Sequence, residues 1–306
     1  MPKRDFLNLA QYERAELDSM LTLAKQLKAS LRKGEPTPRL QGKALGMVFH
    51  KPSLRTRMSF DIGMFQLGGH ALYITDQEIG LGKRESIYDV GNVMSRYVAG
   101  IMIRTFDEAN AVRLAEAAAI PVINGLTDQT HPCQVFCDLL TISEHGFPLD
   151  GIKVAYLGDG NNMVHSWINA ARSFKLDFWF AGPEGYDPQA SYIEAARAKG
   201  VGTVTLTRSA EDAVRGAHVV YTDTWTSMGQ EAETERRRQV FPPYQVNEKL
   251  LALADPKAIV MHCLPAHRNE EITDPVMDGP QSVVFDQAEN RLHGQKAILV
   301  HCLAGQ

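Results

Sequence analysis

The sequence has few cysteines, no long apolar run and no marked excess of charge of either sign. Its 306 residues carry a formal net charge of -4, so nothing favours a general role in binding nucleic acids or membrane surfaces. No apolar run reaches the roughly 20 residues of a membrane span. The N-terminus, MPKRDFLNL, turns polar too soon for a signal peptide. We therefore predict a cytoplasmic protein.

The four cysteines are scattered at positions 133, 137, 263 and 302, which is not the pattern of a disulfide framework. A reducing compartment is the expected setting. His131, Cys133 and Cys137 suggest a zinc site at first sight, but their spacing fits no common structural zinc pattern. We predict that the protein binds no metal.

Short apolar segments alternate with longer segments of helical periodicity along the chain. Near-continuous apolar strands alternating with helices are typical of parallel sheets covered on both faces. Because nine strands are many for one sheet, we predict an α/β protein of two doubly wound parallel-sheet domains with a cleft between them, linked by long N- and C-terminal helices. The predicted strands are ALGMVF, ALYI, IMIRTF, PVIN, VAYLG, FWFAG, TVTLT, VVYTD and AIVMHC.

A domain boundary is predicted in the stretch EHGFPLDGIK, which combines a helix-stopping glycine, a proline and a turn. The first domain would cover residues 1–147 and the second 148–285. A long helix is predicted over YERAELDSMLTLAKQLKASLRKG. A last helix, over about residues 286–306, is expected to pack back on the first domain.

Ligands of doubly wound sheets bind beyond the carboxyl ends of the strands. The segment FHKPSLRTRMSF follows the first predicted strand, and helical periodicity begins directly after Ser53. Free N–H groups and the helix dipole at such a turn attract an anion. The hydroxyls of Ser53 and Thr56 and the planar guanidinium of Arg55 suit a phosphate. The alternative is a solvated helix start with incidental arginines.

Two further stretches of the first half follow strands. Arg104 ends the apolar run IMIR, and an arginine there needs either a carboxylate partner or a ligand. His131 opens the next helix, with Gln134 three residues on. An imidazole N–H and a side-chain amide together suit a ligand group that offers both an acceptor and a donor.

In the second half, GDGNN, TDTWTSMG and HCLPAH follow strands. GDGNNM lacks the third glycine of a dinucleotide loop, so nicotinamide binding is the weaker alternative for it. Asp223 suits the α-ammonium of a ligand, although helix capping also explains it. A sulfur such as that of Cys263 can accept a hydrogen bond from an amine, but free cysteines are usually small buried hydrophobes.

Together these stretches resemble the aspartate and ornithine carbamoyltransferase family over about residues 6–303, and its ornithine branch in particular. The resemblance implies transfer of the carbamoyl group from carbamoyl phosphate to the δ-amine of L-ornithine in arginine metabolism. No cofactor is implied, and the expected assembly is a homotrimer or an assembly of trimers. The motifs that carry the resemblance are SLRTR, HPCQ, GDGNN, DTWTSMG, HCLP and the arginine of GPQSVVFDQAENR.

The resemblance also implies roles for individual residues. The residues expected to take part directly in catalysis are Arg104, His131, Asp223 and Cys263. The ornithine-binding residues would be Asn162, Asp223, Ser227 and Met228. Carbamoyl phosphate would be bound by Ser53, Leu54, Arg55, Thr56, Arg104, His131, Gln134, Cys263, Leu264 and Arg291.

The chain departs from the family pattern at two positions. Leu54 stands where the family usually has threonine, and Gly80 falls where many members place a Gln or His that reaches the phosphate of a neighbouring subunit. Two outcomes are open at Gly80: Gln77, Lys83 or Arg84 compensates for it, or the contact shared between subunits is weaker. The alternatives are a carbamoyltransferase for putrescine or an acylated ornithine, a nicotinamide-dependent oxidoreductase and a non-catalytic binder.

Overall fold

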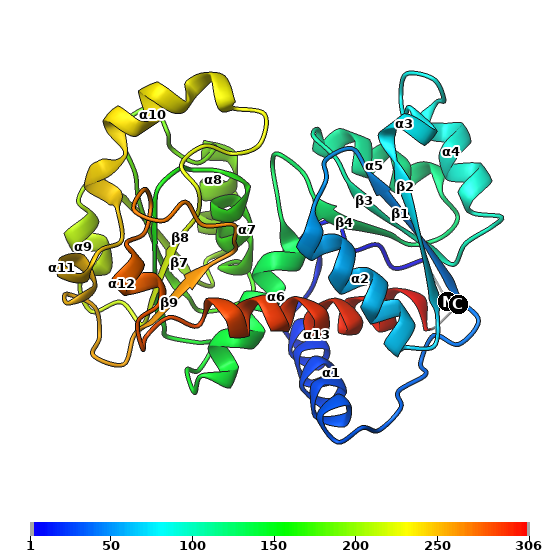
Figure 1. Cartoon of the computed structure of the whole chain (residues 1–306), viewed down its shortest axis with the longest axis horizontal. Coiled ribbons are helices and arrows are strands. Elements are labelled where there is room, and N and C mark those ends of the chain that lie inside the picture. The colour runs from blue at the N-terminus through cyan, green and yellow to red at the C-terminus, as the bar shows by residue number, and fades with distance from the viewer. Residues whose placement is uncertain (1–2, 305–306) are drawn as a thin grey trace. The chain divides into compact units, whose positions relative to one another are not determined.

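The computed structural model describes residues 3–304, and the chain divides into two compact units, each built on a sheet (Figure 1). Unit 1 takes in the chain up to Leu140 and again from Glu289, and unit 2 is Thr141–Ala288. Both changes of unit fall inside continuous helices, α6 (Pro132–Glu144) and α13 (Val284–Leu303). The predicted first boundary, 147/148, lies just beyond the end of α6. The role of each unit stays a prediction.

Unit 1 contains a four-stranded parallel sheet in the order β2-β1-β3-β4. The β3 side chains are all buried, as the apolar sequence predicts. The strands are β1 (Ala44–Phe49), β2 (His70–Thr75), β3 (Gly100–Arg104) and β4 (Val122–Leu126). The helices, besides parts of α6 and α13, are η1 (Leu9–Gln11), α1 (Arg14–Arg32), α2 (Leu54–Gln66), α3 (Asp76–Ile79), α4 (Ile87–Met94) and α5 (Glu108–Ala117).

Unit 2 contains a five-stranded parallel sheet in the order β7-β6-β5-β8-β9. The strands are β5 (Lys153–Leu157), β6 (Asp177–Ala181), β7 (Thr203–Thr207), β8 (Val219–Thr222) and β9 (Ile259–His262). The helices are α7 (Asn162–Ala170), α8 (Ala190–Lys199), α9 (Ala210–Val214), η2 (Glu231–Glu233), α10 (Thr234–Val240), η3 (Pro242–Tyr244), α11 (Glu248–Leu251) and α12 (Asp274–Met277). The predicted α/β class, two parallel sheets and nine strand positions are confirmed.

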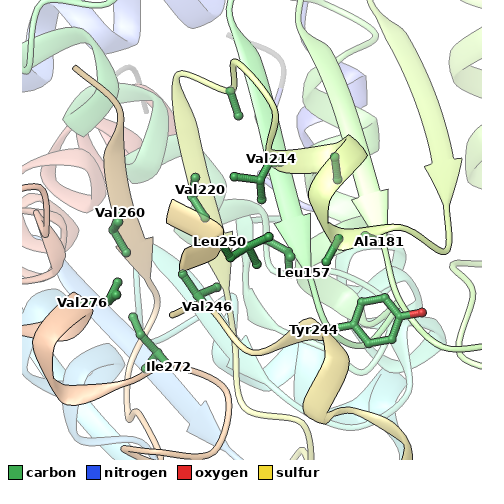
Figure 2. Close-up of a cluster of buried hydrophobic side chains, with 14 of the residues drawn as sticks. Leu157, Ala181, Val214, Val220, Tyr244, Val246, Leu250, Val260, Ile272 and Val276 are labelled. Carbon is green, nitrogen blue, oxygen red and sulfur yellow. The ribbon is translucent and has the colours of Figure 1, made fainter. Parts of the chain in front are cut away.

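Each unit has its own hydrophobic core. In unit 2, side chains of β5, β8 and β9 meet those of the short helices α9, α11 and α12 (Figure 2). Leu157 and Val220 belong to this cluster and are fully buried. In unit 1, Val48 and Ile103 form a separate cluster with residues of α4 and α5. Burial of each such side chain contributes roughly 1.5–3 kcal/mol to the free energy of folding. Each sheet is therefore stabilised by its own core and does not depend on the turns that follow its strands.

Helix α2 buries small and hydroxylated residues together with the two apolar side chains of Phe60 and Met64. Thr56, Ser59 and Gly63 are buried. A Cβ on Gly63 would lie 3.3 Å from Cγ of Lys296 in α13, so glycine permits this close approach. A second set of apolar residues at helical spacing points to solvent, with exposed fractions of 69% for Leu54, 55% for Met58, 42% for Ile62 and 75% for Phe65.

Lys296 of α13 is fully buried and donates to Oε1 of Gln66 at 2.9 Å. Burial lowers the pKa of Lys296 to about 8, whereas an unfolded lysine titrates near roughly 10.4. The unfolded chain therefore binds more protons between these values. It follows that the free energy of unfolding rises with pH across this window.

We expect Lys296→Met to remove that rise and to stabilise the protein at pH 7 by on the order of 1 kcal/mol. The measurement is urea unfolding of wild type and variant at pH 7, 8.5 and 10. Lys25→Met, at an exposed position of α1, is the matched control and is expected to change neither quantity. Equal pH profiles for wild type and Lys296→Met would contradict the assignment.

Across residues 3–304, every helix is too short or too polar to cross a membrane.

Candidate functional site

The turn after β1 has the predicted architecture. β1 ends at Phe49, α2 begins at Leu54, and Ser53 is the N-cap, whose side chain accepts from the Thr56 N–H at 3.3 Å. The N–H groups of a first helical turn lack partners within the helix. Arg57 is exposed and stacks over the Tyr73 ring of β2, with its guanidinium carbon 4.1 Å from the ring centroid.

Arg291 of α13 is buried against this helix start, with 3% of its surface exposed. Its Nη1 donates to Oε1 of Gln134 at 2.6 Å, and its Nη2 donates to Oγ1 of Thr56 at 3.2 Å. With the Gln295 amide turned so that its oxygen faces the guanidinium, this oxygen accepts from Nη2 at 2.8 Å and from Nε at 3.1 Å. These partners are all neutral, and within the described residues Arg291 has no ion-pair partner. A buried guanidinium in this state favours an anion beside it.

His131 is buried next to this arginine. Burial holds the pKa of His131 well below its usual range, and the charges of Arg291, Arg104 and Arg55 lower it further. The imidazole is therefore neutral at pH 7 and keeps one ring N–H as a donor. Positive charge thus converges on His131 from β3, α2 and α13.

Lys51 ties the turn after β1 to the loop that precedes α6. It is buried, forms an ion pair with Asp128, and lies 4.2 Å from the ring centroid of Phe106. The side chain of Gln134 is held in place by a buried carboxylate. Its Nε2 donates to Oδ1 of Asp138 at 2.9 Å. Asp138 and Gln295 were missed by sequence reasoning, because both lie on helix faces that read as ordinary core.

The segment around Gly80 is a turn that only glycine fits easily. Gly80 has φ 56°, and a Cβ there would lie 2.8 Å from Cβ of Arg84. Arg84 donates to the carbonyl of Glu78, so its guanidinium is held within its own segment. Gln77 and Lys83 are exposed. Compensation for Gly80 by one of these side chains stays a prediction.

In unit 2, Asp223 follows β8 directly and collects three donors. Its Oδ1 accepts from the Thr224 N–H at 2.8 Å and from Sγ of Cys263 at 3.0 Å. Its Oδ2 accepts from Nδ2 of Asn161 at 3.3 Å. Asn161 is the N-cap of α7 and its own oxygen accepts from the Met163 N–H at 3.0 Å, so its amide orientation is fixed. The predicted pairing of Cys263 with Asp223 is thus present in the geometry.

Arg237 of α10 fixes the loop that carries Ser227 and Met228. Its Nη1 donates to Oδ2 of Asp159 at 2.8 Å and to the carbonyl of Trp225 at 2.7 Å. Burial raises the pKa of Asp159, and the Arg237 charge opposes that rise. One buried ion pair therefore joins the GDGNN turn to the base of the TDTWTSMG loop. Sequence reasoning missed it, because the partners are far apart in the chain and no local pattern marks them.

His262 shapes the turn after β9. Its Nδ1 accepts from the Leu264 N–H at 2.9 Å, and its Nε2 lies 3.0 Å from Oε1 of the buried Glu271. Asp223, His262 and Cys263 have potential ligand atoms within 4.8 Å of one another. Both ring nitrogens of His262 already have partners, so this cluster is better suited to hydrogen bonding than to a metal ion.

The zinc alternative at the start of α6 gains no support from the geometry. Sγ of Cys133 donates to the Asn124 carbonyl at 3.2 Å, and Sγ of Cys137 lies 3.9 Å from the Arg291 carbonyl. Burial raises the pKa of Cys133 to about 12 and also raises that of Cys137. Among the described residues, the groups of side chains with ligand atoms close enough together for a metal ion do not include His131, Cys133 or Cys137.

Comparisons with known proteins match both units. Residues 4–144 match the family model "Aspartate/ornithine carbamoyltransferase, carbamoyl-P binding domain", and residues 150–302 match "Aspartate/ornithine carbamoyltransferase, Asp/Orn binding domain". The chain is 53% identical to the ornithine carbamoyltransferase of Brucella suis over 300 residues, 98% of this chain and 96% of the relative. It is 50% identical to that of Syntrophotalea carbinolica, covering 99% of this chain and all of the relative.

Solved structures are similar over the full length. The ornithine carbamoyltransferase of Pyrococcus furiosus superposes with a TM-score of 0.95 at 47% identity, covering 100% of this chain and 98% of that one. The anabolic ornithine carbamoyltransferase of Campylobacter jejuni gives a TM-score of 0.93 at 34% identity, covering 99% of this chain and 100% of that one.

Proposed function

Because the chain belongs to the aspartate/ornithine carbamoyltransferase family and converts carbamoyl phosphate and ornithine to citrulline, we propose that each unit holds one substrate. The phosphate half-site in unit 1 consists of Ser53, Leu54, Arg55, Thr56, Arg104, His131, Gln134 and Arg291. The amine half-site in unit 2 consists of Asn162, Asp223, Ser227, Met228 and Cys263.

The phosphate half-site binds the acyl donor through charge and hydrogen bonds. The first turn of α2 and Arg55 hold the phosphate, which reverses the unfavourable effect of basic side chains on the helix dipole. Arg104 and neutral His131 donate to the carbamoyl oxygen, on which negative charge develops in the tetrahedral intermediate. Gln134 accepts from the carbamoyl NH2. The observation that carries this assignment is the buried Arg291, which is hydrogen-bonded to Thr56 and Gln134 and has no counter-ion among residues 3–304.

The amine half-site orients ornithine and accepts hydrogen bonds from its δ-amine, which attacks in the uncharged form. Free amines of this kind titrate near roughly 10, so losing a proton is a real barrier at pH 7. Asp223 and Cys263 accept from the nitrogen and guide its lone pair to the carbamoyl carbon. Asn162, Ser227 and Met228 hold the α-amino and α-carboxyl end. The nitrogen then bonds to carbon and gives its extra proton to Asp223, the tetrahedral intermediate collapses, and phosphate leaves with the C–O bond electrons. Positioning and charge stabilisation are the contributions required of these residues.

We propose that the working form is a homotrimer in the cytoplasm. The exposed apolar stripe of α2 formed by Leu54, Met58, Ile62 and Phe65 supports this assembly, because a contiguous apolar face of this kind normally packs against a partner. A second copy is the partner that explains why the stripe adjoins the phosphate half-site. Sedimentation analysis tests the proposal, since a monomer at micromolar concentration would contradict it.

The activity is tested by a citrulline assay with purified protein, carbamoyl phosphate and a panel of amines. Ornithine is expected to be carbamoylated at least a hundredfold more efficiently than putrescine or N-acetylornithine, because both lack a charged group that the amine half-site pairs. Equal use of putrescine would contradict the assignment of Asn162, Ser227 and Met228 to the α-amino and α-carboxyl end of ornithine.

A further inference from the structure

We propose that Met228 is a modification site, at which oxidation of the thioether by a peroxide switches off the use of ornithine. The inference rests on the proposed function, in which Met228 belongs to the amine half-site. It concerns how that half-site responds to oxidants.

Met228 stands out among the methionines. In the part of the chain that the structure describes, only Met58 and Met228 are exposed, at 55% and 50%. The others, Met20, Met47, Met64, Met94, Met102, Met163, Met261 and Met277, are at most 8% exposed. Met58 lies on the apolar stripe of α2 that a second copy is proposed to cover. Met228 is then the methionine that remains open to solvent in the assembled protein, and exposure governs oxidation.

The loop presents Met228 outward from a hydrogen-bonded turn. The Ser227 N–H donates to Oε1 of Gln230 at 3.2 Å, and the Gly229 N–H donates to Oε1 of Glu231 at 2.9 Å. Gly229 adopts φ 95°, which reverses the chain there. The neighbours of Met228 are therefore bonded within the loop, while its own side chain faces water.

The base of this loop is fixed as well. Nη1 of Arg237 donates to the Trp225 carbonyl at 2.7 Å and is paired with Asp159. The loop as a whole therefore cannot shift to compensate for a chemical change at Met228. Such a change directly alters the side chain that contacts the substrate.

The chemistry is a two-electron oxygen transfer. One oxygen of hydrogen peroxide becomes bonded to the Met228 sulfur, the thioether is oxidised to the sulfoxide, and the peroxide is reduced to water. The product is polar and hydrated, whereas the thioether is apolar. Burying it against the methylenes of ornithine would desolvate a polar group, so the KM for ornithine should rise at least about tenfold. The KM for carbamoyl phosphate should change less than twofold.

The experiment treats wild type, Met228→Leu and Met58→Leu with hydrogen peroxide. Dithiothreitol follows, which reverses sulfenic acid and disulfides at Cys263 but not methionine sulfoxide. Peptide mass spectrometry reports oxidation at each methionine, and each protein is compared with its own untreated sample. Leucine keeps the apolar volume but has no sulfur to oxidise.

The expected result is a raised KM for ornithine in treated wild type and Met58→Leu, no rise in Met228→Leu, and recovery of wild type by methionine sulfoxide reductase. An equal rise in Met228→Leu, or oxidation at Met228 with an unchanged KM, would overturn the inference alone. No citrulline from untreated wild type would overturn the proposed function and, with it, the inference.

Discussion

Arg291→Met is expected to lower kcat/KM for carbamoyl phosphate by about 10²–10³-fold, the usual cost of removing a charge-stabilising donor from an active site. The guanidinium is buried, bridges Gln134 and Thr56, and lacks a carboxylate partner among the described residues. Since no carboxylate of the described residues neutralises the positive charge of Arg291, this charge can interact with the substrate. Methionine fills a similar volume without the charge.

Two further variants separate charge from geometry at this position. Arg291→Lys keeps the charge, but a single ammonium cannot reproduce the fork to Gln134 and Thr56, so an intermediate loss is expected. Arg32→Ala removes an exposed arginine of α1 that lies 3.7 Å from Glu289 and should behave as wild type. Steady-state kinetics with both substrates varied measures the effect, and circular dichroism checks the fold. If Arg291→Met kept more than a tenth of the wild-type kcat/KM, the guanidinium would have a structural role only.

Asp223→Asn is the second variant with a large expected effect, a fall in kcat/KM for ornithine of about 10²–10⁴-fold. The carboxylate of Asp223 accepts from three donors: Asn161 Nδ2, the Thr224 N–H and Cys263 Sγ. An asparagine here must turn its NH2 toward one of them. Asn161 cannot flip to receive it, because its oxygen already accepts from the Met163 N–H.

The same substitution also removes the negative charge that favours a cationic substrate and accepts a proton. Asp187→Asn is the matched control, because Asp187 pairs with Arg208 at 2.6 Å near the surface of the same unit. It is expected to change kcat/KM for ornithine less than twofold. A comparable loss in both variants would mean that Asp223 acts through the stability of unit 2.

The fold was largely predictable, because parallel strands buried on both faces leave near-continuous apolar runs. The start of α2 was equally readable, since Ser53 is a typical N-cap between an apolar strand and a helical pattern. Hydrophobic periodicity does not predict which face of a helix packs against the rest of the protein. Met58 and Phe65 recur at helical spacing, yet α2 buries Thr56 and Gly63.

The physical reason lies in the partner helix. α13 brings long polar side chains, Arg291 and Lys296, toward α2, and these need hydroxyls and small residues opposite them. The sequence of α2 alone does not indicate which side chains α13, more than two hundred residues later, places against it. The Arg237–Asp159 pair escaped prediction for the same reason, whereas Asp223 and Cys263 were found because each directly follows a strand of the same sheet.

The central claim is that the acyl donor and the amine are held by separate sets of residues, and equilibrium binding of carbamoyl phosphate to two variants tests it most directly. Titration calorimetry without ornithine would compare wild type, Arg55→Ala and Asp223→Asn. The account predicts that Arg55→Ala loses at least about tenfold in affinity, since a charged hydrogen bond to phosphate is worth about 1.5–3 kcal/mol. Asp223→Asn should bind within twofold of wild type. Unchanged affinity in Arg55→Ala, or an equal loss in both variants, would contradict it.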